Sequence, residues 1–357
     1  MSRSLRAAII GAGAQGWVHA FGYSRLPGVE VVAVSDVDSA AAAELAQSHG
    51  ARAYRDATEL LDAEGIDVVS ICTPPAFHAG LVTEAVAAGA SAIHTEKPMA
   101  LRFDDAMRMR DLARASGVLL TVNHQRRLDP LQLAVRDAVS AGEIGEIIGV
   151  AGYCANLFDW GSHTLDLIRF HLGDRPALWV LAQIDVAARK RVYGALTETS
   201  GIVRIRFEGD LDALIVTGRD DGVLHPLGSN GITLQGSRGR IDVFGGAAVI
   251  HADGREPRVL RESVVAEFAA GMRGVDPAVL QDTAYAIADL ISSLRGGSSP
   301  ILDASRGLAA AELAFAAYES SMRRGRVWLP LDVWDNALER GLESGAWRPD
   351  REILTTH

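Results

Sequence analysis

The chain has 357 residues, 48% of them hydrophobic and 22% charged, which predicts a globular protein of two domains with full hydrophobic cores. Its formal net charge of −10 argues against binding to nucleic acid or to an anionic membrane surface. No apolar stretch reaches the roughly 18 residues of a membrane span, and Cys72 and Cys154 form no disulfide or metal-binding pattern, so we expect a cytoplasmic protein.

The first predicted strand and helix carry a dinucleotide-binding motif. Residues 7–10 are apolar and predict a buried parallel strand, which leads into Gly11-x-Gly13-x-x-Gly16 and a helix. In this pattern Gly11 allows the turn out of the strand, Gly13 lets the backbone approach a pyrophosphate, and Gly16 lets the helix pack on the sheet. The phosphates then lie at the helix N-terminus, where free N–H groups and the helix dipole favour an anion.

An acidic residue follows the glycines at the distance that dinucleotide binding requires. Residues 29–34 predict the second strand, and Asp36 lies at its end. A carboxylate there accepts hydrogen bonds from the adenosine ribose and repels a 2′-phosphate, which favours NAD over NADP. The alternative is an acidic residue in a surface loop. Asp38 is a second carboxylate nearby, and no basic residue lies close in the sequence to receive a phosphate.

The pattern of helix and strand then alternates, which predicts a doubly wound parallel sheet. The expected elements are helices at residues 39–50, 56–61, 78–88 and 104–116 and strands at residues 68–72, 91–94 and 118–122. Thr73, Pro74 and Pro75 follow one strand, at the edge where a doubly wound sheet binds its ligand, and should line the cofactor groove. His78 is either a polar residue at a helix start or a cofactor contact.

Glu96-Lys97-Pro98 follows the strand at residues 91–94. A lysine at a strand end, before a proline that fixes the turn, is directed into the groove, where its ammonium can stabilise a developing alkoxide. The alternative is a solvated surface lysine. Residues 123–127 follow the next strand at the same edge, and we place the domain boundary there.

The second half of the chain predicts a different sheet. The expected elements are helices at residues 130–141, 277–295 and 305–322 and strands at residues 147–153, 200–207, 213–217, 231–235 and 239–243. Strands without intervening helices predict antiparallel pairing. We therefore expect a Rossmann domain at residues 1–125, a second α/β domain at 126–330 and a C-terminal extension at 331–357, which either wraps the domain or crosses a subunit boundary.

A second candidate catalytic stretch opens a helix near residue 159. Asp159 and His163 are four residues apart, so their side chains can meet on one helix face. A carboxylate beside an imidazole suits a general base near neutral pH. Alternatively, Asp159 caps the helix and His163 is a partnered buried residue, or the two share a metal ion with His171 or His124 as a third ligand.

Together these stretches resemble the family of glucose-fructose oxidoreductase and inositol dehydrogenase, the Gfo/Idh/MocA family, from about residue 5 to Pro330. The matching segments are, in chain order, Gly11-Ala12-Gly13-Ala14-Gln15-Gly16, Asp36, Thr73-Pro74-Pro75 with His78, Glu96-Lys97-Pro98, Arg126-Arg127-Leu128-Asp129-Pro130, Asp159-x-Gly161-x-His163 with Asp166, and Gly236-Ser237-Arg238-Gly239. The resemblance implies an N-terminal Rossmann domain and a C-terminal α/β domain with a large, mostly antiparallel open sheet that mediates homodimers or homotetramers. It also implies an NAD cofactor between the domains and a carbohydrate substrate.

The resemblance also assigns roles to residues. Lys97 resembles the active-site lysine that holds the reacting hydroxyl, His163 the general base and Asp159 its partner, while Pro98 is expected to follow a cis peptide. The implied cofactor-binding residues are Gly11, Gly13, Ala14, Gln15, Gly16, Asp36, Thr73, Pro74, His78, Glu96, Lys97 and Gln125. The implied substrate-binding residues are Lys97, His124, Arg126, Trp160 and His163.

Two features bear on the substrate. His124 stands where relatives often have an aromatic or small apolar residue, which marks a particular substrate. Arg126, Arg127 and Trp160 are candidates for contact with an acidic sugar. The basic run at residues 189–191 is a further candidate, or it is a solvated turn.

The expected reaction is the reversible oxidation of a secondary hydroxyl of a sugar, inositol or sugar derivative, with His163 taking the proton and the hydride passing to C4 of the nicotinamide. Three alternatives remain open at this stage. The same first steps would serve an NAD-dependent glycoside hydrolase that forms a transient keto sugar. A regulator that only binds NAD would need the glycines and Asp36 alone, and a metal-dependent hydrolase would lose activity to a chelator.

Overall fold

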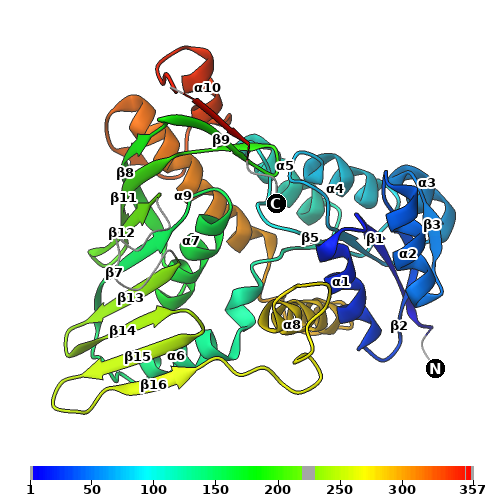
Figure 1. The fold of residues 1–357 in the computed structure, drawn as a ribbon, viewed down its shortest axis with the longest axis horizontal. Helices are drawn as coiled ribbons and strands as arrows, with labels where there is room; N and C mark the ends of the chain where they lie inside the picture. Colours follow the sequence, from blue (N-terminus) through cyan, green and yellow to red (C-terminus); the bar gives the residue numbers. More distant parts are fainter. Residues whose placement is uncertain (1–2, 219–229, 350, 355–357) are drawn as a thin grey trace. The chain divides into compact units, whose positions relative to one another are not determined.

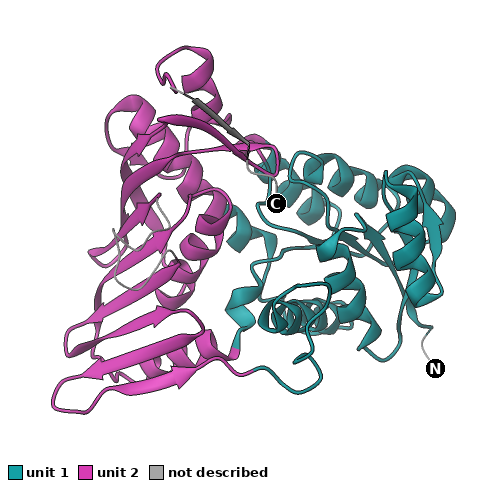
Figure 2. Cartoon of the chain, in the orientation of Figure 1, with its two compact units in different colours: residues 1–100, 105–129, 264–308 teal, residues 101–104, 130–263, 309–357 magenta. Residues whose placement is uncertain are grey.

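The computed structural model describes residues 3–218, 230–349 and 351–354, and the chain forms two compact units (Figure 1). Unit 1 comprises residues 1–100, 105–129 and 264–308, and unit 2 comprises residues 101–104, 130–263 and 309–357 (Figure 2). These bounds differ from the expected domains at one large segment, because residues 264–308 pack within unit 1. The expected domain limits at residues 125 and 330 stay predictions.

Unit 1 is built on a six-stranded sheet in the order β3-β2-β1-β4-β5-β6, and all of its described pairs are parallel. Its strands are β1 (Leu5–Ile10), β2 (Val29–Ser35), β3 (Arg52–Tyr54), β4 (Val68–Ile71), β5 (Ala92–Thr95) and β6 (Leu119–Val122). The connecting helices are α1 (Ala14–Ser24), α2 (Ser39–His49), α3 (Ala57–Glu64), α4 (His78–Ala87) and α5 (Phe103–Ala115). The predicted doubly wound sheet is confirmed. The edge strand β3 was not predicted, because it has three residues and lacks an apolar run.

A helix from the second half of the sequence completes the core of unit 1. α8 (Pro277–Leu294) packs against α1, and Ile287, Leu290 and Ile291 join the apolar cluster of the parallel strands. A Cβ on Gly22 would lie 2.7 Å from Cδ1 of Ile287, so the two helices approach closely where α1 has no side chain. This packing explains why residues 264–308 belong to unit 1.

Unit 2 is built on a nine-stranded sheet in the order β16-β15-β14-β13-β7-β12-β11-β8-β17. Among its described pairs, β7 with β12 is parallel and the others are antiparallel, so the predicted mostly antiparallel sheet is confirmed. Its strands are β7 (Ile147–Cys154), β8 (Ala177–Asp185), β11 (Ser200–Phe207), β12 (Leu211–Thr217), β13 (Gly231–Gly236), β14 (Gly239–Phe244), β15 (Ala247–Ala252), β16 (Arg258–Arg261) and β17 (Val327–Trp328).

Helices α6, α7 and α9 pack against this sheet, and α7 (Trp160–His171) contacts β7. A Cβ on Gly152 of β7 would lie 3.1 Å from side-chain atoms of both Thr164 and Ile168, so this glycine lets α7 approach the sheet. α9 (Ala304–Arg323) lies against β8, where the hydroxyls of Ser320 and Ser321 accept hydrogen bonds from strand amides. α6 (Pro130–Ser140) contacts β15 and β16.

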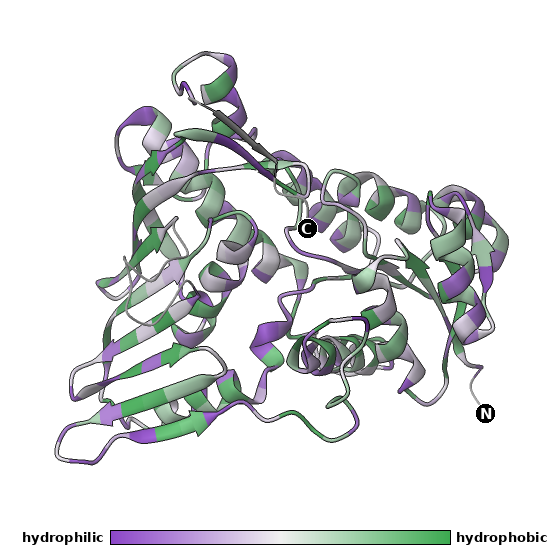
Figure 3. Cartoon of the chain, viewed as in Figure 1, coloured by the Kyte–Doolittle hydropathy of each residue, from purple (hydrophilic) through white to green (hydrophobic). Residues whose placement is uncertain are grey.

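The other face of the sheet carries exposed apolar side chains. Leu181 of β8, Ile202 of β11 and Leu214 of β12 are 43%, 57% and 47% exposed. The strand register puts them on one face, because Arg204 pairs with both Leu181 and Leu214 and Ile202 lies two residues before it. Figure 3 shows the mixture of hydrophobic and hydrophilic residues along these strands.

The C-terminal extension packs on its own chain. α10 (Ala337–Glu343) is followed by β18 (Arg351–Leu354), which pairs in parallel with β9 (Ala188–Val192), and β10 (Ala195–Thr197) pairs with β9 on the other side. The basic run at residues 189–191 therefore lies in β9, and its interpretation as a solvated turn was wrong. Across residues 3–218, 230–349 and 351–354, no helix has the length and apolar character to cross a membrane.

Candidate functional site

The three glycines of the motif that joins β1 to α1 each have a different environment. Gly11 has φ +99°, and a Cβ there would lie 2.7 Å from the carbonyl oxygen of Cys72. A Cβ on Gly16 would lie 2.1 Å from the carbonyl oxygen of Gly11, whereas a Cβ on Gly13 would meet nothing within 4 Å. The N-cap residue of α1 is Gly13, which makes no side-chain capping hydrogen bond. The loop is therefore open at Gly13, beside helix amides suited to an anion, and these residues fit a bound pyrophosphate.

Asp36 is fixed at the edge of this loop. Its Oδ2 accepts a hydrogen bond of 2.7 Å from the amide of Ala12, and its Oδ1 accepts one of 2.9 Å from the amide of Asp38. The carboxylate is half-buried at the end of β2. Each carboxylate oxygen has a second lone pair, so the group retains acceptor sites for ribose hydroxyls. Asp38 has a different role, since its side chain caps α2.

The residue before Lys97, Glu96, is a buried carboxylate with two side-chain hydrogen-bond donors. Oε1 of Glu96 is 3.0 Å from Nε2 of His19 and 2.7 Å from Nδ2 of Asn123, and Glu96 is only 7% exposed. Burial opposes ionisation of Glu96, but the hydrogen bonds and charge of His19, with the amide of Asn123, outweigh burial and lower the pKa of Glu96 to about 2. The carboxylate is therefore ionised and only accepts hydrogen bonds, so Nε2 of His19 carries a proton.

The hydrogen bond between His19 and Glu96 belongs to a network that joins elements far apart in the sequence. Nδ1 of His19 in α1 lies 3.0 Å from Oγ of Ser70 in β4, and that oxygen lies 2.9 Å from the hydroxyl of Tyr23. Nδ2 of Asn123, after β6, also lies 3.5 Å from Oγ1 of Thr283 in α8. His19, Ser70, Tyr23 and Thr283 are fully buried, so the network fixes the carboxyl ends of the central strands.

The second oxygen of Glu96 holds the main chain at Lys97. Oε2 accepts a hydrogen bond of 3.1 Å from the amide of Lys97, whose side chain is half-buried. The Lys97–Pro98 peptide is cis, which confirms that expectation. The buried network therefore fixes the position at which Lys97 leaves β5.

His78 links the loop that follows β4 to the loop that follows β5. Its Nε2 lies 2.8 Å from the carbonyl oxygen of Thr73 and its Nδ1 lies 3.2 Å from that of Met99. Burial lowers the pKa of His78, so the ring is neutral and donates to one carbonyl at a time. His78 is fully buried, whereas Pro74 is exposed and Thr73 is half-buried at the strand end. Contact of His78 with a cofactor stays a prediction.

Asp159 and His163 lie at the start of α7 in unit 2, where they are 4% and 5% exposed. Asp159 occupies the N-cap position, but its side chain makes no capping hydrogen bond, so the alternative that it serves as a cap is wrong. Its main chain is well fixed. The amide of Asp159 donates to Oδ1 of Asn156, and its carbonyl accepts a hydrogen bond from the hydroxyl of Ser162, both at 2.7 Å.

A buried carboxyl group supports the chain just before α7. Oε1 of Glu198 accepts a hydrogen bond of 2.6 Å from the amide of Leu157, and Oε2 accepts one of 2.8 Å from the hydroxyl of Tyr318 in α9. Burial raises the pKa of Glu198, and the hydrogen bonds from Tyr318 and Leu157 offset this only in part. Glu198 and Tyr318 therefore fix the segment that leads into the helix of Asp159 and His163.

The remaining candidate residues have varied exposure. His124 and Gln125 are buried at the start of a 3₁₀ turn (Gln125–Leu128), Arg126 is half-buried, and Trp160 is 40% exposed on α7. Nε2 of His171 donates a hydrogen bond of 2.9 Å to Oε1 of Gln132. Among the residues that the structure describes, no group of three His, Cys, Asp or Glu side chains is placed to hold a metal ion.

The structure also adds supporting residues that the sequence did not single out. They are His19, Asn123, Glu198 and Tyr318. His19 was visible as a polar residue in an otherwise apolar stretch of α1, and Asn123 as a polar residue at a strand end. Neither Glu198 nor Tyr318 had a local signal, because their partners are 41 and 120 residues apart in the chain.

Comparison with known proteins agrees with this geometry. A family model described as "Oxidoreductase family, NAD-binding Rossmann fold" (GFO_IDH_MocA) matches residues 5–124. Over 352 residues the chain is 29% identical to an inositol 2-dehydrogenase of Rhizobium meliloti strain 1021, covering 91% of this chain and 99% of the relative. The chain is therefore similar to the Gfo/Idh/MocA family, whose model it matches over its Rossmann sheet. It is an NAD-dependent oxidoreductase, and NAD is its cofactor.

Two further comparisons extend this likeness. It is 33% identical over 213 residues to a D-apiose dehydrogenase of Paraburkholderia graminis, covering 54% of this chain and 55% of the relative. The crystal structure of an oxidoreductase from Agrobacterium radiobacter, in complex with NAD+, L-tartaric acid and magnesium, matches with a TM-score of 0.78. That match covers 91% of this chain and 98% of the other at 20% identity, which supports the fold alone.

Proposed function

We propose that this protein oxidises a secondary hydroxyl of a sugar, an inositol or a related polyol to a ketone, reversibly and with NAD. The observation that carries the proposal is the fixed position of Lys97, whose amide is held by the ionised carboxylate of Glu96 at the carboxyl end of β5. The names of two relatives, an inositol 2-dehydrogenase and a D-apiose dehydrogenase, support the substrate class.

The proposed mechanism assigns one task to each side chain. The ammonium of Lys97 donates a hydrogen bond to the reacting hydroxyl oxygen and stabilises the negative charge that develops there. The imidazole of His163 takes the hydroxyl proton, and Asp159, one helical turn before it, favours the protonated ring. NAD, when bound, would supply the acceptor for the hydride of the carbinol carbon. The reverse reaction uses the same groups, with His163 returning the proton.

Residues around these groups are assigned to the substrate and the cofactor. We assign His124, Arg126 and Trp160 to contacts with the substrate, and Gln125 with Thr73 to the nicotinamide side. Trp160 supports this assignment because it is a partly exposed aromatic side chain on the first turn of α7, next to Asp159. Amphipathic aromatic side chains of this kind pack against sugar rings through their apolar faces.

The test follows reduced cofactor and sugar cleavage together. The purified protein is given NAD and a panel of free sugars, inositols, acidic sugars and aryl glycosides, and NADH absorbance and aglycone release are recorded. Accumulation of NADH with a free sugar or inositol supports the proposal and identifies the substrate class. Aglycone release that requires NAD without net NADH would instead identify a redox-assisted glycoside hydrolase.

Two variants test the assigned roles. We expect Lys97→Met and His163→Gln each to lower kcat by about a hundredfold or more, which is the usual loss for a charge-stabilising group or a general base. The dissociation constant for NAD, measured by titration of intrinsic fluorescence, should change little in His163→Gln. Full activity in both variants would contradict the mechanism.

We also propose that the protein forms a homodimer through the outward face of its nine-stranded sheet. The support is the row of exposed aliphatic side chains Leu181, Ile202 and Leu214 on three neighbouring strands. Arg204 lies between Leu181 and Leu214 on this face, and exposed apolar side chains that cluster on one face of a sheet mark an interaction site.

A further inference from the structure

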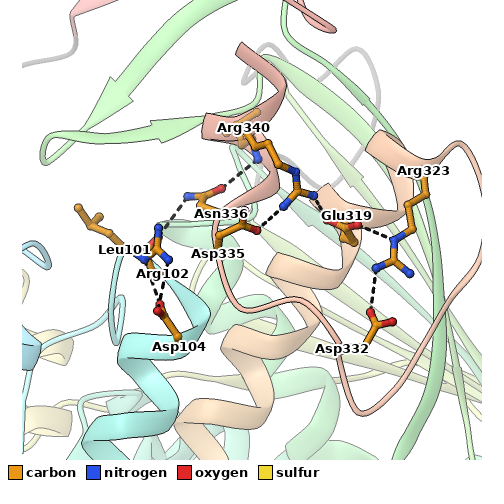
Figure 4. Close-up of polar contacts among 10 residues, drawn as sticks. Leu101, Arg102, Asp104, Glu319, Arg323, Asp332, Asp335, Asn336 and Arg340 are labelled. Atoms are coloured by element: carbon orange, nitrogen blue, oxygen red, sulfur yellow. Dashed lines mark hydrogen bonds and ion pairs between the residues drawn. The ribbon is translucent and has the colours of Figure 1, made fainter. Parts of the chain in front are cut away.

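The C-terminal extension, residues 331–357, is held to the body of unit 2 by buried charge. Arg340 of α10 forms ion pairs with both Asp335 and Glu319, and Arg323 binds the same Glu319 (Figure 4). Glu319 is buried, so its carboxylate depends on the two arginines that flank it. Asn336 begins α10, and its Oδ1 accepts a hydrogen bond of 3.0 Å from the amide of Leu338.

The same extension also forms hydrogen bonds with residues 101–104, a short segment from the first half of the chain. Nδ2 of Asn336 donates a hydrogen bond of 3.2 Å to the carbonyl oxygen of Leu101, and the amide of Asp104 donates one of 2.8 Å to the carbonyl oxygen of Trp334. Asn336 is 4% exposed, so its amide has little access to water. Figure 4 shows Asn336 directed toward Leu101 and, on its other side, toward α10.

Residues 101–104 directly continue the loop that carries Lys97. Only Pro98, Met99 and Ala100 separate Lys97 from Leu101, and all three are buried. The carbonyl oxygen of Met99 lies 3.2 Å from Nδ1 of His78. The main chain after Lys97 is therefore tethered to His78 at Met99 and to Asn336 at Leu101.

We propose that Asn336 is a positioning residue for Lys97, and that the C-terminal extension supports the candidate site through this one residue. The inference rests on the proposed function, because it requires Lys97 to contact the reacting hydroxyl. A lysine stabilises an alkoxide only from the correct distance and direction, and displacement of a catalytic group by about 1 Å can cost a hundredfold in rate. Asn336 limits such displacement by fixing the carbonyl oxygen four residues after Lys97.

The decisive variant is Asn336→Asp. Aspartate retains the oxygen that caps α10, but it has no N–H group to donate to the carbonyl of Leu101. We expect kcat for substrate oxidation to fall about tenfold, with an unchanged dissociation constant for NAD, because the effect is confined to the Lys97 side of the reaction. Asn336→Ser retains a capping oxygen without adding charge, and it should reproduce the loss if Asn336→Asp folds poorly.

A matched control lies in the same extension. Asp332 is an exposed residue whose carboxylate forms an ion pair with Arg323 rather than with residues 101–104. We expect Asp332→Asn to leave kcat unchanged, since exposed ion pairs contribute little. Equal losses of kcat in Asp332→Asn and Asn336→Asp would overturn the inference, because the extension would then matter only through general stability.

A double variant separates this inference from the proposed function. If Asn336 acts through Lys97, adding Asn336→Asp to Lys97→Met should change the residual kcat by less than about twofold, against about tenfold in the wild-type background. Equal losses in the two backgrounds would overturn the inference alone. Full activity of Lys97→Met would instead contradict the proposed function.

Hydrogen exchange gives a readout that does not need activity. In Asn336→Asp the amides of residues 99–104 should exchange faster than in the wild type, whereas amides in β1 and β4 should not change. Unchanged exchange at residues 99–104 would overturn the inference whatever the kinetics.

Discussion

The carboxylate of Glu96 lies 3.0 Å from Nε2 of His19, although 77 residues separate the two in the chain. His19 belongs to the helix that follows the glycine loop, and Glu96 immediately precedes Lys97. One buried hydrogen bond to a carboxylate therefore joins the cofactor-binding helix to the segment that carries the proposed catalytic lysine. Removing His19 would leave the ionised carboxylate of Glu96 buried without this donor, which is strongly destabilising.

This relationship predicts how stability depends on pH. The pKa of Glu96 is lowered from 4.5 to about 2 in the folded protein, so its contribution to the free energy of unfolding is present above pH 4.5 and is lost as pH falls toward 2. We expect Glu96→Gln to lower the free energy of unfolding at pH 7 by on the order of 3 kcal/mol, and the difference to shrink toward pH 3. Denaturant unfolding at pH 7, 5 and 3 measures both quantities.

The control for that series is Glu256→Gln, because Glu256 is an exposed glutamate in unit 2. We expect its free energy of unfolding to follow the wild type at every pH. A difference between Glu96→Gln and the wild type that stays constant from pH 7 to pH 3 would argue that the ionised form of Glu96 is not what the fold stabilises.

Asp36 should determine the choice of cofactor. In Asp36→Asn the negative charge is lost, so a ribose hydroxyl loses a charged acceptor and a 2′-phosphate is no longer repelled. We expect the dissociation constant for NAD to rise about tenfold and the preference for NAD over NADP to shrink. Calorimetric titration with each cofactor measures the two constants.

Asp38→Asn is the control, because asparagine still caps α2 and cofactor binding should not change. Undiminished discrimination against NADP in Asp36→Asn would assign that role to another group.

Tyr318 should stabilise unit 2 through Glu198. Tyr318→Phe removes the donor to a buried carboxyl group, so we expect the free energy of unfolding to fall by about 1.5–3 kcal/mol. Because burial raises the pKa of Glu198, its ionised form is costly, and loss of the hydroxyl should cost more at pH 8 than at pH 4. Denaturant unfolding at the two pH values tests both expectations.

Tyr54 provides the comparison, because it also donates to a carboxylate but in a site more exposed to water. The hydroxyl of Tyr54 donates to Oε1 of Glu64 at 2.7 Å, but the pair is only partly buried. We expect Tyr54→Phe to cost less than about 1 kcal/mol, since water can replace the lost hydroxyl. If Tyr54→Phe and Tyr318→Phe were equally destabilising, burial of Glu198 would not be the reason for the larger effect.

Local patterns predicted most of the fold. The strand expected at residues 200–207 is β11 (Ser200–Phe207), because its polar and apolar residues alternate with burial. β8 (Ala177–Asp185) was missed since Leu181 breaks the alternation, and an outward-facing apolar residue cannot be distinguished from a core residue in the sequence. α8 was predicted as a helix, but its packing on α1 depends on contacts that no local pattern records.

In the candidate site, too, the features that depend on local sequence were predictable and those that depend on long-range contacts were not. The glycine loop and Asp36 were predictable because their roles depend on backbone conformation and spacing within one strand–helix–strand unit. The hydrogen bonds of Glu96 with His19 and Asn123 were not, since they form only after the strand order brings β4, β5 and β6 beside α1. The hydrogen bond from Asn336 to Leu101 joins residues 235 positions apart, and it likewise has no signature in the sequence.

The exposed aliphatic row on the nine-stranded sheet should control assembly. Ile202 is 57% exposed and lies on β11, two residues before Arg204, which pairs with Leu181 and Leu214 on the two neighbouring strands. A charge at Ile202 would therefore be buried without a partner in a face-to-face dimer. We expect the wild type to sediment as a dimer at micromolar concentration and Ile202→Lys as a monomer.

The comparison is Val259→Lys, because Val259 is similarly exposed but lies on β16 at the far end of the sheet. This variant should stay dimeric. A dimeric Ile202→Lys would exclude this face as the interface. A monomeric wild type would mean that the exposed aliphatic row serves no self-association, since no partner copy would then be available to cover it.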